Sequence, residues 1–322
     1  METHLAAPHS LSDQRDLVIY GALRSGSTLL RLMVNQNPEL HCPGEIDFLF
    51  DHIGFDETSQ SWVMDIASLK MDRIFLSSGL DVPDTTEAGA AVHDMIAQYR
   101  ARDSRRLVIM VHRNVAHIRR YLNDPLIVHL LRDPRDVAAS SISLEWAGNV
   151  YYGADHWINT EGEWGRDAAD LDPSSLLELR FEELIADPEK TLSELCSFFG
   201  TSFSPAMLEY HKTSTYAPVD PSLSSQWKTK RTEQEIALVE LRVGALLASR
   251  GFAPSGVEPI NLSRLGEWRL WLSNKFHVWK LRLRRHGLYD PIALAVCNRL
   301  GLQRFAVSAQ MRINERSQKM LK

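Results

Sequence analysis

Residues 17–30 read LVIYGALRSGSTLL, and this stretch decides the fold. Its first four residues form a short, wholly apolar run, and from Thr28 apolar residues recur at helical spacing, at Leu29, Leu32 and Met33. Between them, Gly21–Thr28 has the glycine spacing of a P-loop, GxxxxG followed by Thr. The pattern therefore predicts a strand, a phosphate-binding loop and a helix in succession.

The predicted loop offers an anion both backbone and side-chain donors. Its N–H groups and those of the following helix N-terminus would point at the anion, where the helix dipole contributes about half a positive charge. Ser27 occupies the position of the lysine that a P-loop NTPase uses on its phosphates, and we expect Arg24 to supply the missing charge. The predicted anion-binding residues are Arg24, Ser25, Gly26, Ser27 and Thr28.

Three more apolar runs, at 107–111, 126–131 and 176–181, precede helix-compatible sequence. Short apolar strands that alternate with helices indicate a parallel sheet covered on both faces, with ligand loops at the carboxyl ends of the strands. We therefore predict an α/β, P-loop-like three-layer fold with a central, mainly parallel sheet flanked by helices. Residues 1–255 are expected to form the main domain, and 256–322 a helical C-terminal extension.

Two segments between these elements are expected to shape the site. Residues 54–102 look mainly helical and would cover it, whereas residues 218–231, rich in Ser, Pro and Lys, are typical of a mobile surface loop.

A second motif, LIVHLLRDPRDVAAS at 126–140, follows the same pattern. Arg132 stands where the strand ends, Pro134 suits the first helical position, and Ser140 lies about two turns into the helix. Because the arginine fork matches a phosphate dianion, Arg132 and Ser140 predict a second phosphate site. The alternative is an ion pair of Arg132 with Asp133 or Asp136, although Asp133 also suits a helix N-cap.

Composition excludes several classes of protein. The 322 residues, 44% hydrophobic, are enough for a substantial core, and the net charge of −5 makes general nucleic-acid binding a poor fit despite a basic stretch at 268–285. Cys42, Cys196 and Cys297 lie far apart without a CxxC pair, which disfavours a zinc site or a disulfide-rich secreted domain. With no signal pattern and no apolar run near the roughly 18 residues of a membrane span, a cytoplasmic location is expected.

Residues 23–30 and 127–140 resemble the 5′-phosphosulfate loop and the 3′-phosphate strand and helix of sulfotransferases that use 3′-phosphoadenosine 5′-phosphosulfate (PAPS). Residues 179–189 and 226–228 are similar to two later stretches of that family, so the resemblance spans about 17–251. It implies transfer of a sulfuryl group from PAPS, without a required metal, to a hydroxyl of a small-molecule, glycan or peptide acceptor.

The resemblance also implies catalytic roles. Glu45 stands where the tyrosylprotein-sulfotransferase branch and related bacterial enzymes carry a catalytic glutamate, but the cytosolic small-molecule branch uses a histidine. His41, His112 and His129 therefore remain alternative bases. Where related enzymes often place a lysine on the leaving oxygen this chain has Arg113, and His112 is a second candidate donor there.

Further expected nucleotide contacts come from later in the chain. Phe181 replaces a common tyrosine of the family, which leaves packing or stacking as its role. In the late loop we expect Trp227 to cover the adenine and Lys228 or Lys230 to hold the 3′-phosphate, and the alternative is an ordinary solvated basic loop.

The helical stretch 265–285 carries an apolar stripe beside Lys and Arg, and three roles remain open for it: packing on the main domain, contact with a partner subunit such as a second copy, or contact with a membrane surface. Residues 300–321 are also helix-compatible. Two rival functions share the predicted fold: a P-loop nucleotide kinase or NTPase that needs Mg²⁺, and a nucleotide-binding protein without activity.

Overall fold

In the computed structural model, a five-stranded parallel sheet has the order β2-β5-β1-β6-β7. The structure describes residues 15–144, 146–300, 302, 305, 308–313 and 316. Its strands are β1 (Leu17–Gly21), β2 (Leu40–His41), β5 (Arg106–Val111), β6 (Leu126–Leu131) and β7 (Leu176–Arg180). The predicted α/β class and parallel sheet are confirmed, and the four apolar runs found in the sequence are the strands β1, β5, β6 and β7.

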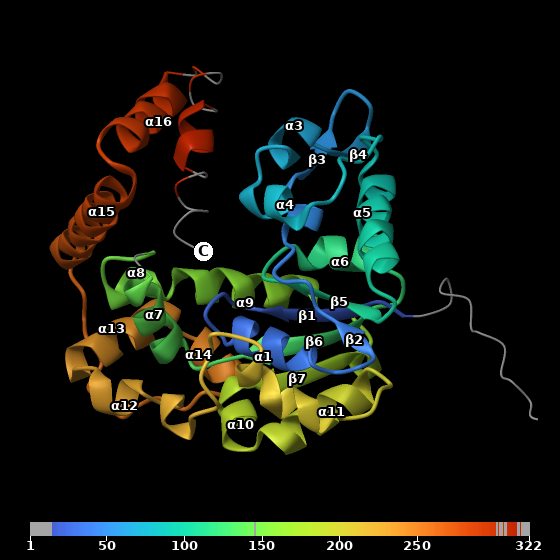
Figure 1. Cartoon of the computed structure of the whole chain (residues 1–322). Helices are drawn as coiled ribbons and strands as arrows, with labels where there is room; N and C mark the ends of the chain where they lie inside the picture. The colour runs from blue at the N-terminus through green and yellow to red at the C-terminus, as the bar shows by residue number, and fades with distance from the viewer. Residues whose placement is uncertain are drawn as a thin grey trace, which may run out of the picture.

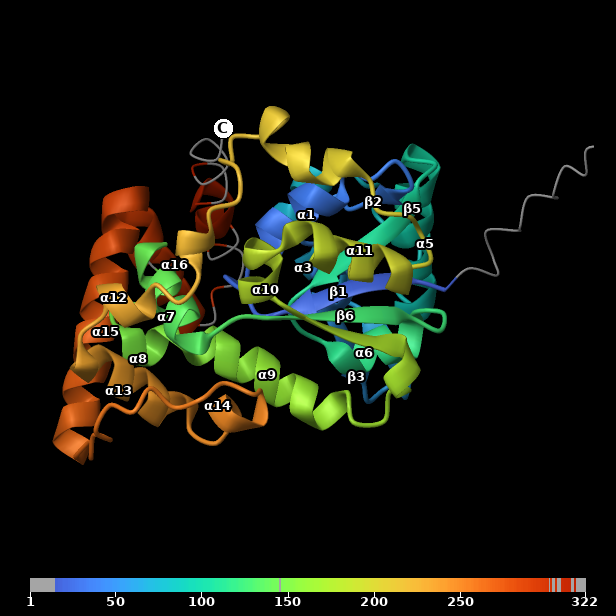
Figure 2. The same cartoon turned by 90° about the horizontal axis from the view of Figure 1, so that it is seen from below.

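Helices cover both faces of this sheet, which makes the predicted three layers (Figures 1 and 2). One face packs on α5 (Ala88–Arg102), α6 (Val115–Tyr121) and α9 (Asp155–Asp167). The other packs on α1 (Ser27–Val34), α10 (Phe181–Ala186) and α11 (Pro188–Phe198). Because successive strand residues point to opposite faces, Val18 belongs to the first core and Ile19 to the second.

A third apolar cluster supports the carboxyl ends of β1 and β6 through Ala22 and Leu131. It is built from α7 (Pro134–Ser143), α8 (Val150–Gly153), α13 (Glu233–Val243) and α14 (Leu246–Ser249). The buried Trp157 belongs to it, and its indole N–H donates to the carbonyl of Arg132 at 2.9 Å. The end of β6 is therefore held in place by packing and by a hydrogen bond.

The expectation of mainly helical structure at 54–102 needs one correction. An antiparallel hairpin, β3 (Ile53–Asp56) and β4 (Ser61–Met64), precedes α3 (Ile66–Leu69) and α4 (Arg73–Ser78). Apolar residues alternate with a period of two there, and Ile53 and Trp62 pack against the first core. The Asp56 carboxylate closes the turn by accepting from the N–H of Thr58 at 2.9 Å.

The shorter elements include α2 (Phe48–Asp51), η2 (Pro173–Ser175) and η3 (Pro205–Lys212). The late segment 218–231 contains η4 (Pro221–Leu223) and α12 (Trp227–Lys230), and the side chain of Trp227 is buried. This segment is therefore packed against the body at Trp227 rather than being an open surface loop along its whole length.

The predicted helical tail is present as α15 (Arg264–His286) and α16 (Tyr289–Arg299), which extend along one side of the body (Figure 1). The helix expected at 300–321 falls mostly outside the described residues. Among the helices that the structure describes, none has both the length and the apolar character needed to cross a membrane.

Candidate active site

The loop between β1 and α1 forms a candidate anion-binding concavity. Arg24 and Gly26 both have left-handed backbone conformations, with φ of 74° and 96°. Alternation of such residues with right-handed ones turns successive N–H groups toward one point. Gly26 is also required by packing, because a Cβ there would lie 2.3 Å from the ring of Phe181. No side chain of the described residues caps the first turn of α1, so its N–H groups remain available to an anion.

Arg132 and Ser140 lie beside this loop, as their places at the end of β6 and in α7 predict. The Arg24 Nε donates to the Ser140 hydroxyl at 3.0 Å, and Arg132 donates to the Arg24 carbonyl at 3.1 Å. The guanidinium of Arg132 lies 4.1 Å from the centroid of the Phe181 ring. These contacts join the two motifs into one site, with Phe181 beneath both.

The alternative ion pair of Arg132 with a neighbouring carboxylate does not form in the described part of the chain. Asp133 instead caps α7 and pairs with Arg135, their Oδ2 and guanidinium nitrogen lying 2.6 Å apart. Burial lowers the pKa of Arg132, although Asp136 nearby partly opposes this effect. Arg132 is thus a half-buried cation with carbonyl partners and no paired anion among the described residues.

A cavity of about 650 Å³ opens between the loop and Arg132. It is lined by Arg24, Gly26, Ser27, Thr28, Arg132, Asp136, Ser140, Phe181, Tyr216, Trp227 and Lys230, among others. Arg132 Nε and Asp136 Oδ2, and Ser25 Oγ in the adjoining loop, are buried without a hydrogen-bond partner among the described residues. Because buried polar atoms in folded proteins are nearly always paired, these atoms indicate a polar ligand.

The late segment forms one wall of this cavity. The indole N–H of Trp227 donates to Asp133 at 3.0 Å and its backbone N–H donates to Asp136 at 2.8 Å. Lys230 lines the cavity, whereas Lys228 lines a separate, neighbouring one. Of the two lysines expected here, the structure therefore brings only Lys230 to the loop and Arg132.

Sequence reasoning gave no ligand-binding role to several residues that line this cavity, and Tyr216 and Asp136 are two of them. Tyr216 lines the cavity with 45% of its surface exposed, and Asp136 was considered only as a partner for Arg132. An aromatic residue just before a Pro-rich loop was the one signal available for Tyr216. Its membership in this wall depends on the path of residues 213–231, which no local pattern predicts.

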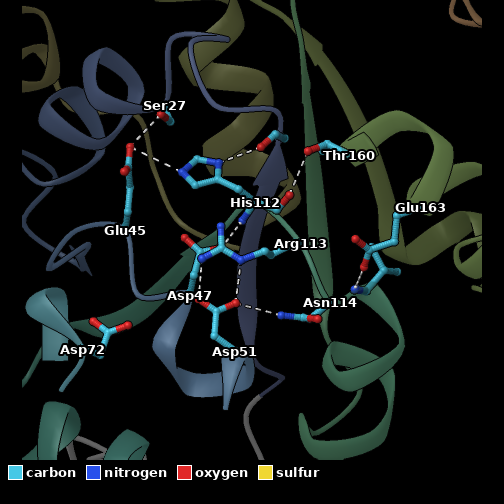
Figure 3. Close-up of polar contacts among 12 residues, drawn as sticks. Ser27, Glu45, Asp47, Asp51, Asp72, His112, Arg113, Asn114, Thr160 and Glu163 are labelled. Carbon is cyan, nitrogen blue, oxygen red and sulfur yellow. Dashed lines mark hydrogen bonds and ion pairs between the residues drawn. The ribbon is translucent and has the colours of Figure 1, made fainter. Parts of the chain in front are cut away.

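Glu45 and His112 face each other at the mouth of the loop (Figure 3). Ile46 donates to the Met110 carbonyl at 2.9 Å, which fixes the Glu45 segment beside the end of β5. The Ser27 hydroxyl donates to Glu45 Oε1 at 3.0 Å, and His112 Nε2 lies 3.4 Å from the same oxygen. The structure thus brings together Ser27 of the glycine loop, the predicted base Glu45 and the alternative base His112.

The tautomer of His112 is set by its other ring nitrogen. Nδ1 lies 2.7 Å from the carbonyl oxygen of Gly21, an acceptor only, so this nitrogen carries a proton. Asp47 accepts from the backbone N–H of His112 at 2.7 Å, and the Thr160 hydroxyl donates to its carbonyl at 3.0 Å. Nε2 is therefore directed at Glu45 by a rigid, buried framework.

The charges of the two groups are coupled. Burial alone would raise the pKa of Glu45, but His112 and the Ser27 hydroxyl lower it to about 2. Burial opposes protonation of His112, but Glu45 and Asp47 together raise its pKa. At neutral pH Glu45 is ionised, and the pair takes up its next proton at His112.

The other two candidate histidines lie elsewhere. His41 pairs with Leu107 at the start of β5, the end of the strand opposite to the site, and its Nδ1 lies 3.1 Å from Asp103. His129 is buried in β6, where Nε2 lies 3.1 Å from Glu161. The structure brings neither to the loop with Glu45.

Arg113 is engaged in a different contact from the one expected of it. Its guanidinium binds the Asp51 carboxylate through two nitrogens, with Nε at 2.6 Å, and points away from the glycine loop (Figure 3). Asn114 donates to the same carboxylate at 3.0 Å. In this conformation Arg113 links the end of β5 to α2 and does not line the cavity. In the described residues, no group of three or more His, Cys, Asp or Glu is arranged to hold a metal ion.

Comparison with known proteins gives a consistent result. A family model described as the sulfotransferase family matches residues 16–205. The sulfotransferase domain of the curacin biosynthetic pathway superposes with a TM-score of 0.53 at 20% identity, over 74% of this chain and 98% of that domain. The corresponding domain of the Synechococcus PCC 7002 olefin synthase gives 0.50 at 20% identity, over 71% and 96%. Both share the fold, and no curated protein matches the sequence.

Proposed function

Because this chain belongs to the sulfotransferase family, we propose that it transfers a sulfuryl group from PAPS to a hydroxyl of a small-molecule, glycan or peptide acceptor. The cavity between the glycine loop and Arg132 carries this proposal. It presents cationic and N–H donors at two separate points, which suits a nucleotide with a 5′-phosphosulfate at one end and a 3′-phosphate at the other.

The residues fit such a donor by their unsatisfied polar atoms. Ser25 Oγ and Arg132 Nε are buried without partners in the described structure, and each can donate to a phosphate oxygen. In this proposal Arg24, Ser25, Gly26, Ser27 and Thr28 hold the 5′ end, while Arg132, Ser140 and Lys230 hold the 3′-phosphate. PAPS, when bound, supplies an activated sulfuryl group on a phosphate leaving group.

Phe181 and Trp227 complete the proposed nucleotide site. Phe181 supports both phosphate positions from below, through its contacts with Gly26 and the Arg132 guanidinium. Trp227 serves as a wall that excludes water, since its indole is buried and hydrogen-bonded to Asp133. The adenine would lie against this wall, with Tyr216 at its open side.

The general base in this proposal is the Glu45–His112 pair. The Gly21 carbonyl accepts a hydrogen bond from Nδ1–H, so the lone pair of the neutral imidazole is on Nε2, the nitrogen that lies 3.4 Å from Glu45 Oε1. The Glu45 carboxylate, 3.4 Å away, stabilises the imidazolium that forms when the acceptor hydroxyl loses its proton. Burial opposes protonation of His112, but its acidic neighbours raise its pKa, so its imidazole is a stronger base than a free histidine, whereas His112 lowers the pKa of Glu45 to about 2.

Charge on the leaving phosphate is balanced by the loop rather than by Arg113. Arg24 and the N–H groups of the first turn of α1 line the cavity, whereas the Arg113 guanidinium is committed to Asp51. We assign Arg113 the task of fixing the β5 end that carries His112, and this replaces the expected contact with the leaving oxygen.

Two experiments test the proposed function. Calorimetric titration should show tighter binding of adenosine 3′,5′-bisphosphate than of ATP, and tighter ATP binding would favour a nucleotide kinase or NTPase. A screen of labelled sulfate transfer from PAPS to phenols, sugars, sterols and peptides should reveal an acceptor. Binding of the bisphosphate without transfer to any acceptor class would favour a nucleotide-binding protein without activity.

The domain boundary is part of the same proposal. Residues 1–255 would form the sulfotransferase domain, whose last packed residues include Leu247 and Phe252 of the third apolar cluster. No helix or strand lies between α14 and α15, and residues 256–322 would form the extension.

A further inference from the structure

Helix α15 exposes an apolar surface that the proposed sulfotransferase site does not use. Leu265, Trp268, Leu272 and Phe276 recur at three- and four-residue steps and are 73%, 58%, 39% and 66% exposed. Residues at these steps share one face of a helix. They form what we call the arm patch, about 17 Å long at 1.5 Å per residue.

The orientation of α15 is set by its contact with the body. Asn149 donates to the Leu270 carbonyl at 2.9 Å, and the Asn274 side chain accepts from the N–H of Gly148 at 2.7 Å. A Cβ at Gly148 would lie 2.7 Å from Cβ of His277, so the helix lies directly on this glycine. Residues 270, 274 and 277 therefore face the body, and at 100° per residue the arm patch lies on the opposite side.

Cations flank the arm patch on both sides. At 100° per residue, Arg269 and Lys280 lie along one edge of the patch, and Lys275 and Arg282 lie along the other. All four are exposed. Lys275 also lies 5.9 Å from the ring of Trp271. An apolar stripe with Trp and Phe, bordered by Lys and Arg, is typical of a helix that lies in the plane of a membrane surface.

The charge of α15 contrasts with that of the rest of the chain. The helix has seven Lys and Arg against one Glu, a net charge of +6, in a chain whose total is −5, which leaves −11 elsewhere. An anionic surface would attract α15 and repel the body on average. Two copies that met through the arm patch would instead bring their Arg269 and Lys275 side chains together, which like-charge repulsion disfavours.

We propose that the arm patch of α15 binds the surface of an anionic lipid bilayer, with Trp268, Leu272 and Phe276 at the acyl boundary and the flanking cations among the headgroups. This is a peripheral contact, in which the helix lies along the surface. It holds the sulfotransferase body close to the bilayer, and no residue of the arm patch lines the nucleotide cavity.

The test is co-sedimentation of the full chain with vesicles of phosphatidylcholine containing about one-third phosphatidylglycerol, compared with phosphatidylcholine alone. The wild-type chain should bind the anionic vesicles at least tenfold more tightly, and binding should weaken as salt is raised. Each cation near such a surface is worth about fivefold in partitioning, so Arg269→Gln with Lys275→Gln should lower it about 30-fold.

Substitutions at the apolar positions test the contact of the arm patch with the acyl boundary. Trp268→Glu with Phe276→Glu should abolish vesicle binding, whereas Leu241→Glu on α13, an exposed apolar position of the body at 43%, should leave it unchanged. Because all these positions are exposed, we expect the variants to fold. An unchanged affinity for adenosine bisphosphate and an unchanged sedimentation coefficient will confirm this.

Three results would overturn the proposal. They are absence of binding to anionic vesicles at low salt, equal binding by the wild-type chain and the Trp268→Glu, Phe276→Glu variant, and a dimer in solution that this variant dissociates. The last result would assign the arm patch to a second copy of the chain.

Discussion

Replacement of Arg132 by alanine should weaken nucleotide binding without weakening the free protein. In the structure the guanidinium is half-buried, its Nε has no partner among the described residues, and its other hydrogen bonds go to the carbonyls of Arg24 and Leu223. A phosphate would therefore meet a cation whose desolvation cost is already included in the folded state. Arg132→Ala removes this cation and the contact of its guanidinium with Phe181.

The magnitude follows from the contacts that a phosphate would make with Arg132. A hydrogen bond to a charged group contributes about 1.5 to 3 kcal/mol, and a bidentate contact with imperfect geometry should total about 2 to 4 kcal/mol. That range corresponds to a loss of about 30- to 900-fold in affinity for adenosine 3′,5′-bisphosphate. The unfolding free energy without nucleotide should change by no more than about 1 kcal/mol, because no ion pair of a described residue is broken.

Titration calorimetry with two ligands that differ in the 3′-phosphate measures the contribution of this phosphate to binding. The wild-type chain should prefer adenosine 3′,5′-bisphosphate over AMP, and Arg132→Ala should remove most of this preference while AMP affinity changes little. Arg132→Lys is the matched control, since it keeps the charge but loses the planar fork. Its affinity for adenosine 3′,5′-bisphosphate should lie between those of the wild-type chain and Arg132→Ala. Equal losses for both ligands, or unchanged affinity for the bisphosphate, would refute the assigned role.

Three further outcomes are expected. Glu45→Gln should lower turnover about a hundredfold or more and leave nucleotide affinity within about twofold, and turnover near wild type in a PAPS assay would remove Glu45 from the base. Gly26→Ala should weaken nucleotide binding at least tenfold, since φ at this residue is 96° and the new Cβ would meet Phe181. The control Gly162→Ala, where the nearest atom to a new Cβ is 3.6 Å away, should not weaken it. Equal effects of the two substitutions would contradict this packing. Because the pKa of Glu45 is lowered from 4.5 to about 2, the contribution of its carboxylate to the free energy of unfolding is complete above about pH 4.5 and is lost as the pH falls toward 2. Because the pKa of His112 is raised, its contribution to the free energy of unfolding is complete below its usual pKa of 6.5 and is lost as the pH rises through the folded value. In urea unfolding, His112→Gln should therefore lower the free energy of unfolding most between about pH 4.5 and 6.5. A loss that does not depend on pH would argue against the Glu45–His112 pair.

Local patterns in the sequence were enough to predict the framework of the site. One short stretch contains the apolar run at 17–20, the glycine spacing after it and the helical spacing from Thr28. A second short stretch contains both Arg132 and Ser140. Strand and helix periods and the conformational freedom of glycine act over a few residues, so they can be recognised without tertiary structure. The glycine loop, the strand that carries Arg132 and the parallel sheet follow from them.

Contacts between distant segments depend on the order of the strands. β5 lies beside β1 although about 85 residues separate them in sequence, and this neighbour relationship brings His112 to the Gly21 carbonyl. No pattern near Glu45 or His112 predicts that they pair, and His41 and His129 have equally plausible local sequences. Burial among particular partners, here Asp103 and Glu161, decides that the latter two lie elsewhere.

The sequence by itself determined the strand, loop and helix that we propose to bind an anion, because that unit requires only a loop and a helix start that are continuous in the chain. The tertiary structure alone decided which acid and which histidine meet there, that Lys230 rather than Lys228 lines the cavity, that Arg113 binds Asp51, and that the arm patch faces outward. Each of these depends on which side chains from remote segments become close neighbours, and that proximity is set by packing of the whole chain rather than by local conformational preference.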